Sequence, residues 1–301
     1  MSILAIDIGG SKLLAGCVDA AGHVHNKVRI PLPTGITQQG LLDVIRQAAT
    51  ELGSIKFTAV GVTIPGLADA KNGIWVHAPF SGIGNFPIAD ELNKMFGIPV
   101  YIENDVNACA LAEKHFGICK NIDDYIWVTI SNGIGGSIVS NNRLFTGYAG
   151  NAGEIGHFNV EETSGNLCGC GNTGCLEVHA GGPAIAKLYT SLSGKAATQS
   201  KEVGELARAG DINAIKTFEK VGAYIGRALS YAVNFVNPEA VILGGGVMMD
   251  GDLLLPTIEQ IFNNSIFAKA NKDVKIYKTA LGYDAALLGA ATLGLLGGTT
   301  K

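Results

Sequence analysis

Short runs of apolar residues, each closed by glycine or by a polar turn, recur along the whole chain. The opening segment "ILAIDIGGSKLLAGCVDAAGHV" predicts a strand, a glycine turn and a second strand that ends at a polar turn. The segment 124–147, "DYIWVTISNGIGGSIVSNNRLFTG", repeats this order. Both copies contain Gly-Gly-Ser, at 9–11 and at 135–137, and we expect this tripeptide to belong to the turn in each half.

The remaining segments alternate between strand and helix patterns. "FTAVGVTIPG" (57–66) predicts a strand closed by Pro-Gly, and "AVILGGGVMM" (240–249) predicts a strand that runs into a third glycine turn. "AIKTFEKVGAYIGRALSYAVNFVNP" has apolar residues at helical spacing and should end before Pro238. Strands alternating with helices, together with the weak duplication, predict an α/β protein of two similar lobes with a cleft between them.

Charge and composition narrow the class of protein. The formal net charge is −4 and no cluster of lysine and arginine occurs, which argues against nucleic acid or an anionic membrane as the main partner. The first residues lack the pattern of a signal peptide, and no apolar run has the length of a membrane span, so we expect a cytoplasmic protein. Because that compartment is reducing, the scattered Cys17, Cys109 and Cys119 are interpreted as buried core residues.

The 41 glycines suggest that backbone closely approaches a ligand in several places. Strand-to-glycine turns can hold phosphate oxygens on backbone N–H groups, although a single such turn is more often a tight hairpin than a ligand site. Neither the P-loop nor the dinucleotide-binding motif is present. Three such turns in one chain, with Thr129 and Ser131 leading the second, favour a nucleotide site. The candidate nucleotide-binding residues are Asp7, Gly9, Gly10, Ser11, Lys12, Asn132, Gly133, Gly135, Gly136, Gly244 and Gly245, with the last two nearer the adenosine.

The segment "CGCGNTGC" (168–175) places three cysteines within eight residues, and His157 lies eleven residues upstream. Together Cys168, Cys170, Cys175 and His157 supply three thiolates and one imidazole, a complete tetrahedral set for Zn²⁺. A redox pair would be expected to have the spacing C-x-x-C, which is absent. With all four positions filled, the zinc is predicted to be structural and to fold a glycine-rich loop that has little apolar content.

"IENDVN" places Asn104 and Asp105 where a strand becomes a helix. Both residue types favour helix starts, so a capping role is one explanation. Side chains at such a junction also commonly reach into a cleft, and Asp105, a carboxylate favoured in its ionised form at a helix start, would suit acid–base work there. The residues alone leave both explanations open.

Six segments resemble, in order, the motifs of the ROK family (repressors, open reading frames, kinases): "AIDIGGSK", "ENDVNA", "TISNGIGGSIV", "GNAGEIGHFNV", "CGCGNTGCLE" and "VILGGGV". The resemblance spans essentially the whole chain. It implies an actin-like (ribonuclease H-like) ATPase fold with two lobes around a central cleft. We expect a small α/β lobe from 1–116 plus about 287–301, and a large α/β lobe from 117–286 that carries the zinc loop.

The resemblance also implies an activity, the Mg²⁺- and ATP-dependent phosphorylation of a hexose or amino sugar at its 6-hydroxyl. Asp105 would then be the general base and Asn104 a binder of sugar hydroxyls. Glu154, His157 and Glu177 would be sugar contacts, although Glu177 also suits a solvated acid at a helix start. Loss of the zinc is therefore expected to raise KM for the sugar far more than KM for ATP.

Two departures from the family pattern concern the substrates. Phe80 and Ser81 stand where glucokinases of the family usually have Asn-Leu, and Ser81 or Asn85 is a candidate to replace that asparagine. The sugar is therefore glucose, N-acetylmannosamine, allose, fructose or a β-glucoside, and an apolar residue at position 80 favours an acetyl group or aglycone. Asn132 replaces a usual threonine but can still bond phosphate.

Other functions compatible with the resemblance are a sugar-sensing regulator without turnover and another actin-like ATPase, such as an acetate-type kinase. The first strand begins at residue 3, before which a helix-turn-helix module has no room, and this favours the kinase. In an acetate-type kinase, the zinc-linked pair of Glu154 and His157 would have no role. Homodimers are common in the family.

Overall fold

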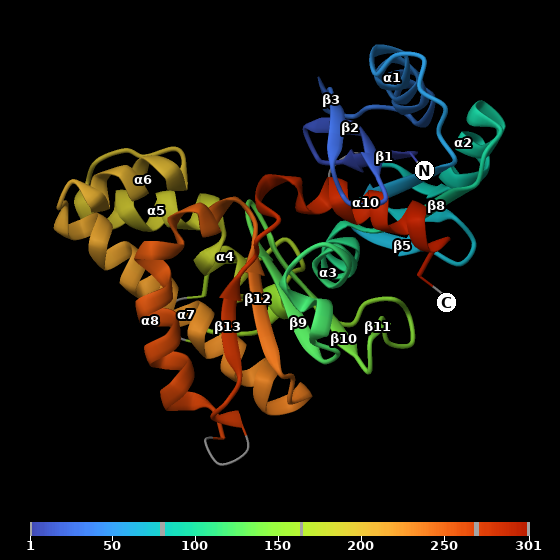
Figure 1. Ribbon diagram of the computed structural model, residues 1–301. Coiled ribbons are helices and arrows are strands. Elements are labelled where there is room, and N and C mark those ends of the chain that lie inside the picture. Colours follow the sequence, from blue (N-terminus) through green and yellow to red (C-terminus); the bar gives the residue numbers. More distant parts are fainter. Residues whose placement is uncertain (1, 79–81, 163–164, 268–270, 300–301) are drawn as a thin grey trace. The chain divides into compact units, whose positions relative to one another are not determined.

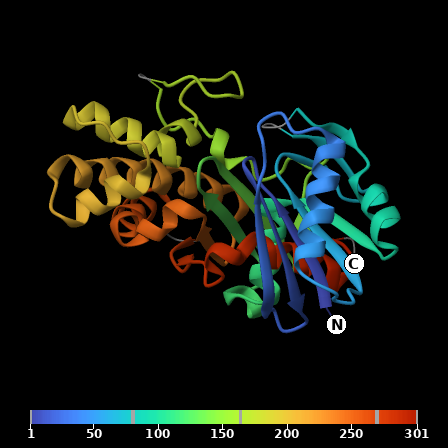
Figure 2. The same cartoon turned by 90° about the horizontal axis from the view of Figure 1, so that it is seen from above.

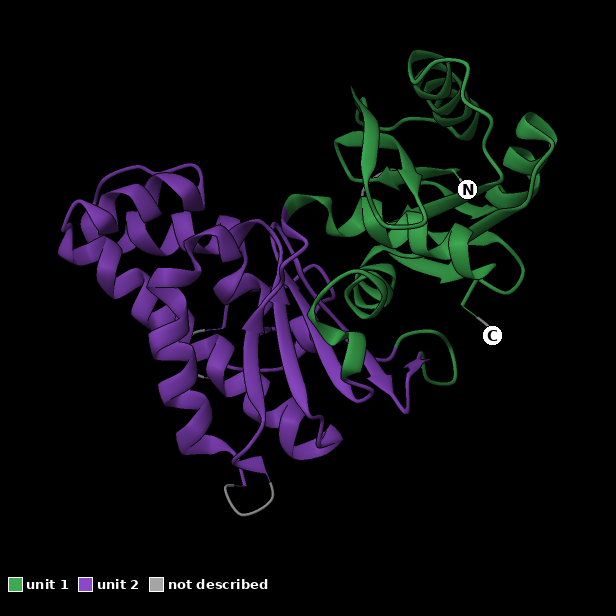
Figure 3. Cartoon of the chain, viewed as in Figure 1, with its two compact units in different colours: residues 1–121, 146–151, 283–301 green, residues 122–145, 152–282 purple. Residues whose placement is uncertain are grey.

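The computed structural model describes residues 2–78, 82–162, 165–267 and 271–299. The chain forms two compact units (Figure 3). Unit 1 consists of residues 1–121, 146–151 and 283–301, and unit 2 of 122–145 and 152–282. The sequence placed the boundaries at 116 and 287, whereas the units divide at 121 and 283, and the short segment 146–151 returns to unit 1.

Unit 1 is built on a mixed sheet in the order β3-β2-β1-β4-β8. Its central strand β1 pairs antiparallel with β2 and parallel with β4, which in turn pairs parallel with β8. The five strands are β1 (Ser2–Ile8), β2 (Lys12–Asp19), β3 (Val24–Pro31), β4 (Ala59–Ile64) and β8 (Val100–Asn104). A second, smaller sheet contains β5 (Leu67–Asp69), β6 (Ile74–His77) and β7 (Gly84–Phe86).

Helices cover both faces of the main sheet of unit 1 (Figures 1 and 2). Leu4, Ile6 and Ile8 share one core with α1 (Gln38–Glu51) and α2 (Ile88–Phe96). On the opposite face α10 (Ala285–Leu296) packs on β1 and β4 and alongside α3 (Asp105–His115). A Cβ at Gly61 of β4 would overlap the carbonyl of Ala290, so α10 lies directly on the strand. The short helix η1 (Ile118–Asn121) follows α3.

Unit 2 repeats this topology, with a sheet in the order β11-β10-β9-β12-β13. Its strands are β9 (Tyr125–Ile130), β10 (Ile134–Ser140), β11 (Arg143–Phe145), β12 (Ala240–Gly244) and β13 (Lys275–Lys278). β9 pairs antiparallel with β10 and parallel with β12, as β1 does with β2 and β4. The predicted duplication is therefore confirmed at the level of strand order and direction.

The position of the second glycine turn was predicted wrongly. Gly135, Gly136 and Ser137 do not form a turn but pair with Thr129, Val128 and Trp127 inside β10. The turn between β9 and β10 is 131–133, which corresponds in topology to 9–11. The repeated Gly-Gly-Ser is a coincidence of composition, because the two copies occupy different positions in the two hairpins.

Helices of unit 2 bury the apolar face of β9 and β12. The helices are α4 (Glu177–Ala180), α5 (Gly182–Ser193), α6 (Ser200–Arg208), α7 (Ile212–Val236) and α8 (Gly251–Ser265), with the short 3-10 helices η2 (Ile155–His157) and η3 (Gly246–Asp250). The 3-10 helix η4 (Gly282–Asp284) lies at the boundary with unit 1. Val128 and Leu243 share their core with Phe218 of α7 and Phe262 of α8. As predicted, α7 ends before Pro238, with Asn237 in the left-handed conformation as its cap. Among the described helices, none is long and apolar enough to cross a membrane.

Candidate active site

Two carboxylates lie close to each other at the ends of strands in unit 1. Asp7 is in β1, and its Oδ1 accepts a hydrogen bond of 2.8 Å from Thr63 Oγ1 in the neighbouring β4. Burial raises the pKa of Asp7, against the opposing effects of that hydrogen bond and of Lys12. Asp105 is the first residue of α3, and burial, followed by the charge of Asp7, raises its pKa to about 7.

We expected the start of the helix to keep Asp105 ionised, but burial and the charge of Asp7 have a larger effect on its pKa. Asp105 Oδ1 does accept a 3.0 Å hydrogen bond from the Val106 N–H, which favours the ionised form. Loss of solvent and the neighbouring negative charge outweigh that bond. A carboxyl group that titrates near neutral pH is well placed to take up and release a proton there.

Asn104 caps α3 and ties it to the loop after β4. Its Oδ1 accepts hydrogen bonds from the N–H groups of Val106 and Asn107, at 2.9 and 3.2 Å. Its Nδ2 donates to the Gly66 carbonyl at 2.9 Å. The cap that the residue type suggests is thus present, and one amide hydrogen remains for a ligand. The neighbouring Glu103 is buried, and its Oε1 accepts hydrogen bonds from Asn104 N–H at 2.8 Å and from Asn107 Nδ2 at 3.2 Å, so it braces the same junction.

The first glycine turn joins β1 to β2 and is held by backbone hydrogen bonds. Gly9 N–H donates to the Lys12 carbonyl at 2.8 Å, and Leu32 N–H donates to the Ser11 carbonyl at 2.9 Å. Gly10, Ser11 and Lys12 are exposed. A tight turn with exposed backbone, one residue beyond the end of the strand that carries Asp7, can approach phosphate oxygens.

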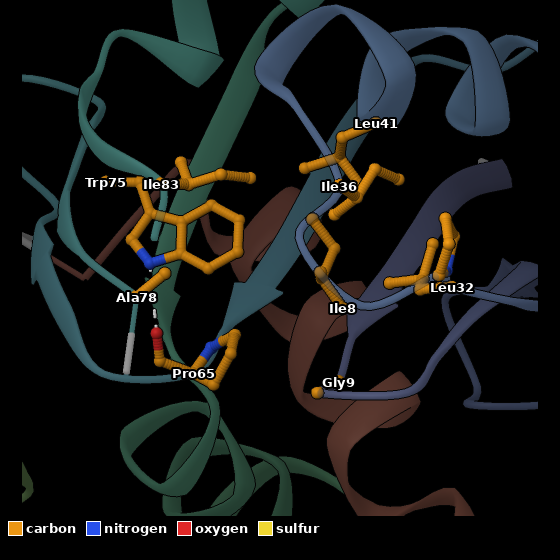
Figure 4. A pocket seen from close by; sticks show the side chains of 11 residues that line it. Ile8, Gly9, Leu32, Ile36, Leu41, Pro65, Trp75, Ala78 and Ile83 are labelled. Atoms are coloured by element: carbon orange, nitrogen blue, oxygen red, sulfur yellow. Dashed lines mark hydrogen bonds between the residues drawn. The ribbon is translucent and has the colours of Figure 1, made fainter. Parts of the chain in front are cut away.

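An apolar pocket lies beside this turn within unit 1 (Figure 4). Ile8 and Gly9 form one side, and Pro65 and Trp75 form the other. The indole Nε1 of Trp75 donates to the Pro65 carbonyl at 3.0 Å, which fixes the ring against the loop that Asn104 also holds. The pocket is therefore adjacent to the Asn104–Asp105 junction. Phe80 and Ser81, on which the substrate prediction depends, lie outside the described residues.

The second glycine turn, 131–133, lies against the backbone of two other segments of unit 2. Ser131 N–H donates to the Gly133 carbonyl at 2.9 Å, and the Ser131 carbonyl accepts from Gly182 N–H, at the start of α5, at 2.7 Å. A Cβ at Gly245, after β12, would overlap the Ile130 carbonyl. The ends of β9 and β12 and the N-terminus of α5 thus meet at one place, where N–H groups can face an anion.

Glu177 connects this turn to the cysteine loop. It is the first residue of α4, and its Oε2 accepts a 3.0 Å hydrogen bond from Ile134 N–H. A Cβ at Gly133 would lie 2.6 Å from that oxygen, so a side chain there would displace the Glu177 carboxylate. The sequence also allowed Glu177 to be a solvated acid at a helix start. Glu177 does begin a helix, but its carboxylate accepts a hydrogen bond at the end of the turn.

The four predicted metal ligands gather in one cluster. The ligand atoms of His157, Cys168, Cys170 and Cys175 all lie within 4.8 Å of one another, and they form the one such cluster of His, Cys, Asp or Glu found in the described chain. Cys168 Sγ lies 3.7 Å from His157 Nδ1, and Cys170 Sγ lies 3.7 Å from Cys175 Sγ. Thiolates bound tetrahedrally to Zn²⁺ are separated by about 3.8 Å, so the donor set fits zinc.

The thiols of the cluster differ in environment. The N–H of Asn172 lowers the pKa of Cys170 to about 7, whereas burial raises the pKa of Cys175 to about 12. A bound divalent cation would favour the thiolate at both positions. The other three cysteines, Cys17, Cys109 and Cys119, are buried as predicted.

The two ring nitrogens of His157 face different partners. Nδ1 lies toward Cys168, while Nε2 is 3.7 Å from Glu154 Oε2. A histidine that binds metal through one nitrogen commonly offers the other N–H to a carboxylate, which fixes the ring. The predicted double role of His157, as metal ligand and as part of a polar pair with Glu154, is therefore compatible with its geometry.

The segment that leads into the cluster packs on β10 by direct backbone contact. A Cβ at Gly136 would lie 2.6 Å from the Gly153 carbonyl, and one at Gly156 would overlap the Ile134 carbonyl. Gly136 therefore serves the approach of 153–156 to the sheet. The cysteine loop, the Glu154–His157 pair and the turn 131–133 therefore form one packed region of unit 2.

Sequence reasoning missed two parts of this arrangement. Thr63 is a fully buried hydroxyl in an otherwise apolar strand, and its polarity in "AVGVTI" was the available signal. Gly181 and Gly182 join α4 to α5 against the second turn, where a Cβ on Gly181 would lie 2.8 Å from the Asn132 carbonyl. Only long-range packing identifies these two glycines.

Substitutions at Glu177 test whether this residue supports the binding of both ATP and the sugar. We expect Glu177→Ala to raise KM for ATP and for sugar together, since the turn loses the acceptor of Ile134 N–H. Glu177→Gln keeps an acceptor and should restore KM for ATP while KM for the sugar stays raised. Steady-state kinetics with each substrate varied in turn would measure both constants. Equal KM for ATP in the wild type and in Glu177→Ala would contradict the connection.

The model of the ROK family matches residues 3–295. The chain is 32% identical over 311 residues to a glucokinase of Thermotoga maritima, with 97% of each chain covered. It is 31% identical to a ROK family glucokinase of Streptomyces griseus crystallised with glucose and AMPPNP, with a TM-score of 0.85 over 98% of this chain and all of the other.

Similarity also extends to a transcription factor. The chain is 32% identical to the DNA-binding transcriptional dual regulator NagC of Escherichia coli K12, over 89% of this chain and 69% of that protein. Similar chains therefore include both kinases and regulators.

Proposed function

Because the chain belongs to the ROK family, we propose that it is an ATP-dependent kinase that phosphorylates a hexose or amino sugar at the 6-hydroxyl. The predicted actin-like ATPase fold with two lobes is confirmed by the match to the glucokinase structure. The single observation that carries the proposal is Asp105, a half-buried carboxyl group that titrates at about pH 7 next to Asp7.

Asp105 would act as the general base. A sugar hydroxyl is a weak nucleophile, and its proton must leave as the oxygen–phosphorus bond forms. With a pKa of about 7, Asp105 is substantially ionised at neutral pH and still basic enough to take that proton. Asn104, fixed by Gly66 and by the start of α3, would use its remaining amide hydrogen to orient a sugar hydroxyl.

The two glycine turns would hold the phosphates of ATP. In unit 1 the exposed turn 9–12 offers backbone N–H groups and the ammonium of Lys12. In unit 2 the turn 131–133 offers the exposed Asn132 and backbone next to the start of α5, while Gly244 and Gly245 lie toward the adenosine. Gly135 and Gly136, which lie within β10, shape this region and are not proposed to contact phosphate.

Asp7 is the residue that would hold Mg²⁺. Its half-buried carboxylate forms no ion pair among the described residues, and Thr63 fixes its orientation. A cation at this position would offset the cost of ionising a buried carboxylate. When bound, the metal would neutralise charge on the transferred phosphoryl group.

Glu154, His157 and Glu177 would contact the sugar. Each can accept or donate hydrogen bonds to neighbouring hydroxyls, and the cysteine cluster with its zinc would hold His157 and the start of α4 in place. The metal is structural in this proposal, because four protein ligands fill its coordination.

The apolar pocket of Figure 4 favours a substituted sugar. Its walls, among them Pro65, Trp75 and Ala78, are apolar, and its volume of about 10 Å³ suits the methyl end of an acetyl group more than a free hydroxyl. We therefore expect kcat/KM to be higher for a substituted sugar than for glucose. An ATP-coupled assay over glucose, N-acetylmannosamine, allose, fructose and a β-glucoside would measure this. A kcat/KM clearly highest for glucose would contradict the assignment of the pocket, though not the kinase activity.

A sugar-binding regulator is the second candidate, favoured by the similarity to NagC. A regulator would bind sugar without ATP turnover. Calorimetric sugar binding in the absence of phosphorylation, by zinc-loaded protein with Mg²⁺ and ATP present, would support it over the kinase.

A further inference from the structure

A second pocket lies within unit 2 beside α4, and none of its lining residues belongs to the turn that Glu177 holds. Side chains from four segments line it: Asn166 from the cysteine loop, His179 from α4, Lys187 from α5, and Lys220 and Tyr224 from α7. None of these residues belongs to the site described above. The pocket combines polar groups with an apolar wall.

The charge in this pocket is predominantly positive. Lys187 Nζ lies 3.5 Å from Asn166 Oδ1, and Lys220 Nζ lies 5.8 Å from the centre of the Tyr224 ring. In the part of the chain that the structure describes, neither ammonium forms an ion pair with a carboxylate. One acid, Glu161, lies beside the pocket, where its Oε2 accepts a hydrogen bond from Tyr224 Oη at 2.9 Å.

His179 adds a polar group without a partner. The residue is 8% exposed, and its Nε2 finds no hydrogen-bond partner among the described residues. Burial lowers the pKa of His179; Glu161 acts in the opposite direction, and Lys220 and Lys187 lower the pKa further. A buried polar group without a partner is costly, which suggests that another molecule completes the site.

We propose that this pocket binds a small phosphorylated molecule. The phosphate dianion would lie between the ammonium groups of Lys187 and Lys220, with Asn166 and Ser191 as additional donors. Val178 and Leu188 provide an apolar wall for the organic part. Two separate ammonium groups without carboxylates suit a dianion better than a single carboxylate, because each can take one of the negative charges.

Occupancy would affect the active site through α4. This helix has only four residues, with Glu177 on the glycine turn at its start and His179 in the pocket. A ligand that contacts the cysteine loop, α4, α5 and α7 together would restrict the motion of the segment that carries Glu177. This consequence rests on the proposed function, whereas binding itself does not.

Isothermal titration calorimetry on the zinc-loaded full-length protein tests the proposal. Glucose and AMPPNP are present at saturation to occupy the candidate active site, and the titrants are glucose 6-phosphate and inorganic phosphate. The variants are the double substitution Lys187→Ala and Lys220→Ala, and the control Lys216→Ala, an exposed lysine one turn before Lys220 on α7 and outside the pocket.

We expect one phosphorylated ligand per chain, and a dissociation constant at least about tenfold higher in the double variant because two charge-assisted hydrogen bonds are lost. The Lys216→Ala control should bind as the wild type does. Equal affinity for both titrants would assign the pocket to the phosphate group alone, and tighter binding of the ester would assign it to a phosphorylated sugar. No binding to the wild type, or equal binding to the double variant and the control, would overturn the proposal. None of these outcomes depends on kinase activity.

Discussion

Asp105→Asn is expected to lower kcat by about 10²–10⁴-fold, the usual contribution of a positioned general base. The amide keeps the shape of the side chain and can still hydrogen-bond a sugar hydroxyl, but it cannot accept the proton. Sugar affinity, measured by calorimetry without turnover, should change much less. Steady-state kinetics of the purified variant gives kcat. A variant that keeps more than about a tenth of the wild-type kcat would leave Asp105 with a role only at the start of α3.

The same variant should also differ from the wild type in how its Tm depends on pH, and this difference can be measured without an activity assay. The pKa of Asp105 is about 7 in the folded protein and about 3.9 in an unfolded chain. The folded state therefore holds this proton more tightly, and ionisation of Asp105 costs stability as the pH rises from about 4 to about 7. Asp105→Asn removes that cost, so its Tm should exceed that of the wild type at pH 8 and match it near pH 4.

Asp124 in unit 2 provides a control for which the expected change in Tm at pH 8 has the opposite sign. Asp124 Oδ1 accepts hydrogen bonds from Ser140 Oγ and Asn141 N–H, at 2.7 and 3.0 Å, and these lower its pKa. Its ionised form stabilises the fold above the pKa of the unfolded chain, and that stability is lost as the pH falls through the lower folded value. Asp124→Asn should therefore lower Tm at pH 8.

Cys170→Ser is expected to abolish binding of about one zinc per chain and to raise KM for both substrates. The sequence alone predicted a selective effect on the sugar. The packing changes that expectation, because the segment 153–156 lies directly on β10 and Glu177 holds the Ile134 N–H. A loop that loses its metal would therefore disturb the sugar contacts and the nucleotide turn together.

Metal analysis, thermal unfolding and kinetics measure this effect independently. Wild-type protein should contain about one zinc, and Cys170→Ser should contain none and unfold at a lower temperature. Cys17→Ala, a buried cysteine outside the cluster, should keep the metal and both KM values. Full zinc content in Cys170→Ser would remove this cysteine from the ligand set, and an unchanged KM for ATP would separate the loop from the turn.

Elements with strong local patterns were predictable from the sequence. β1, β2, β9, β10 and β12 are continuous apolar runs, and α7 combines helical spacing with a proline stop. β3 was missed because "VHNKVRIP" is a polar edge strand with mostly exposed side chains. The small sheet was missed because β5, β6 and β7 have only three or four residues each.

The sequence predicts which nearby residues act together better than it predicts the role of each one. The spacing of Cys168, Cys170 and Cys175 already indicates a common ligand, and the structure gathers them with His157. The connection of Glu177 to Gly133 crosses more than forty residues of chain and has no local signal. The raised pKa of Asp105 is also a long-range effect, since it depends on burial and on Asp7 in another strand.

Direct detection of phosphorylated sugar tests the central claim most directly. Zinc-loaded protein would be incubated with Mg²⁺, ATP and each sugar of the panel, and the product analysed by phosphorus and proton NMR. We expect a 6-phosphate from at least one sugar with wild-type protein, and at most about a hundredth of that initial rate with Asp105→Asn. Sugar that binds to the wild type but yields no phosphate ester with ATP would contradict the account.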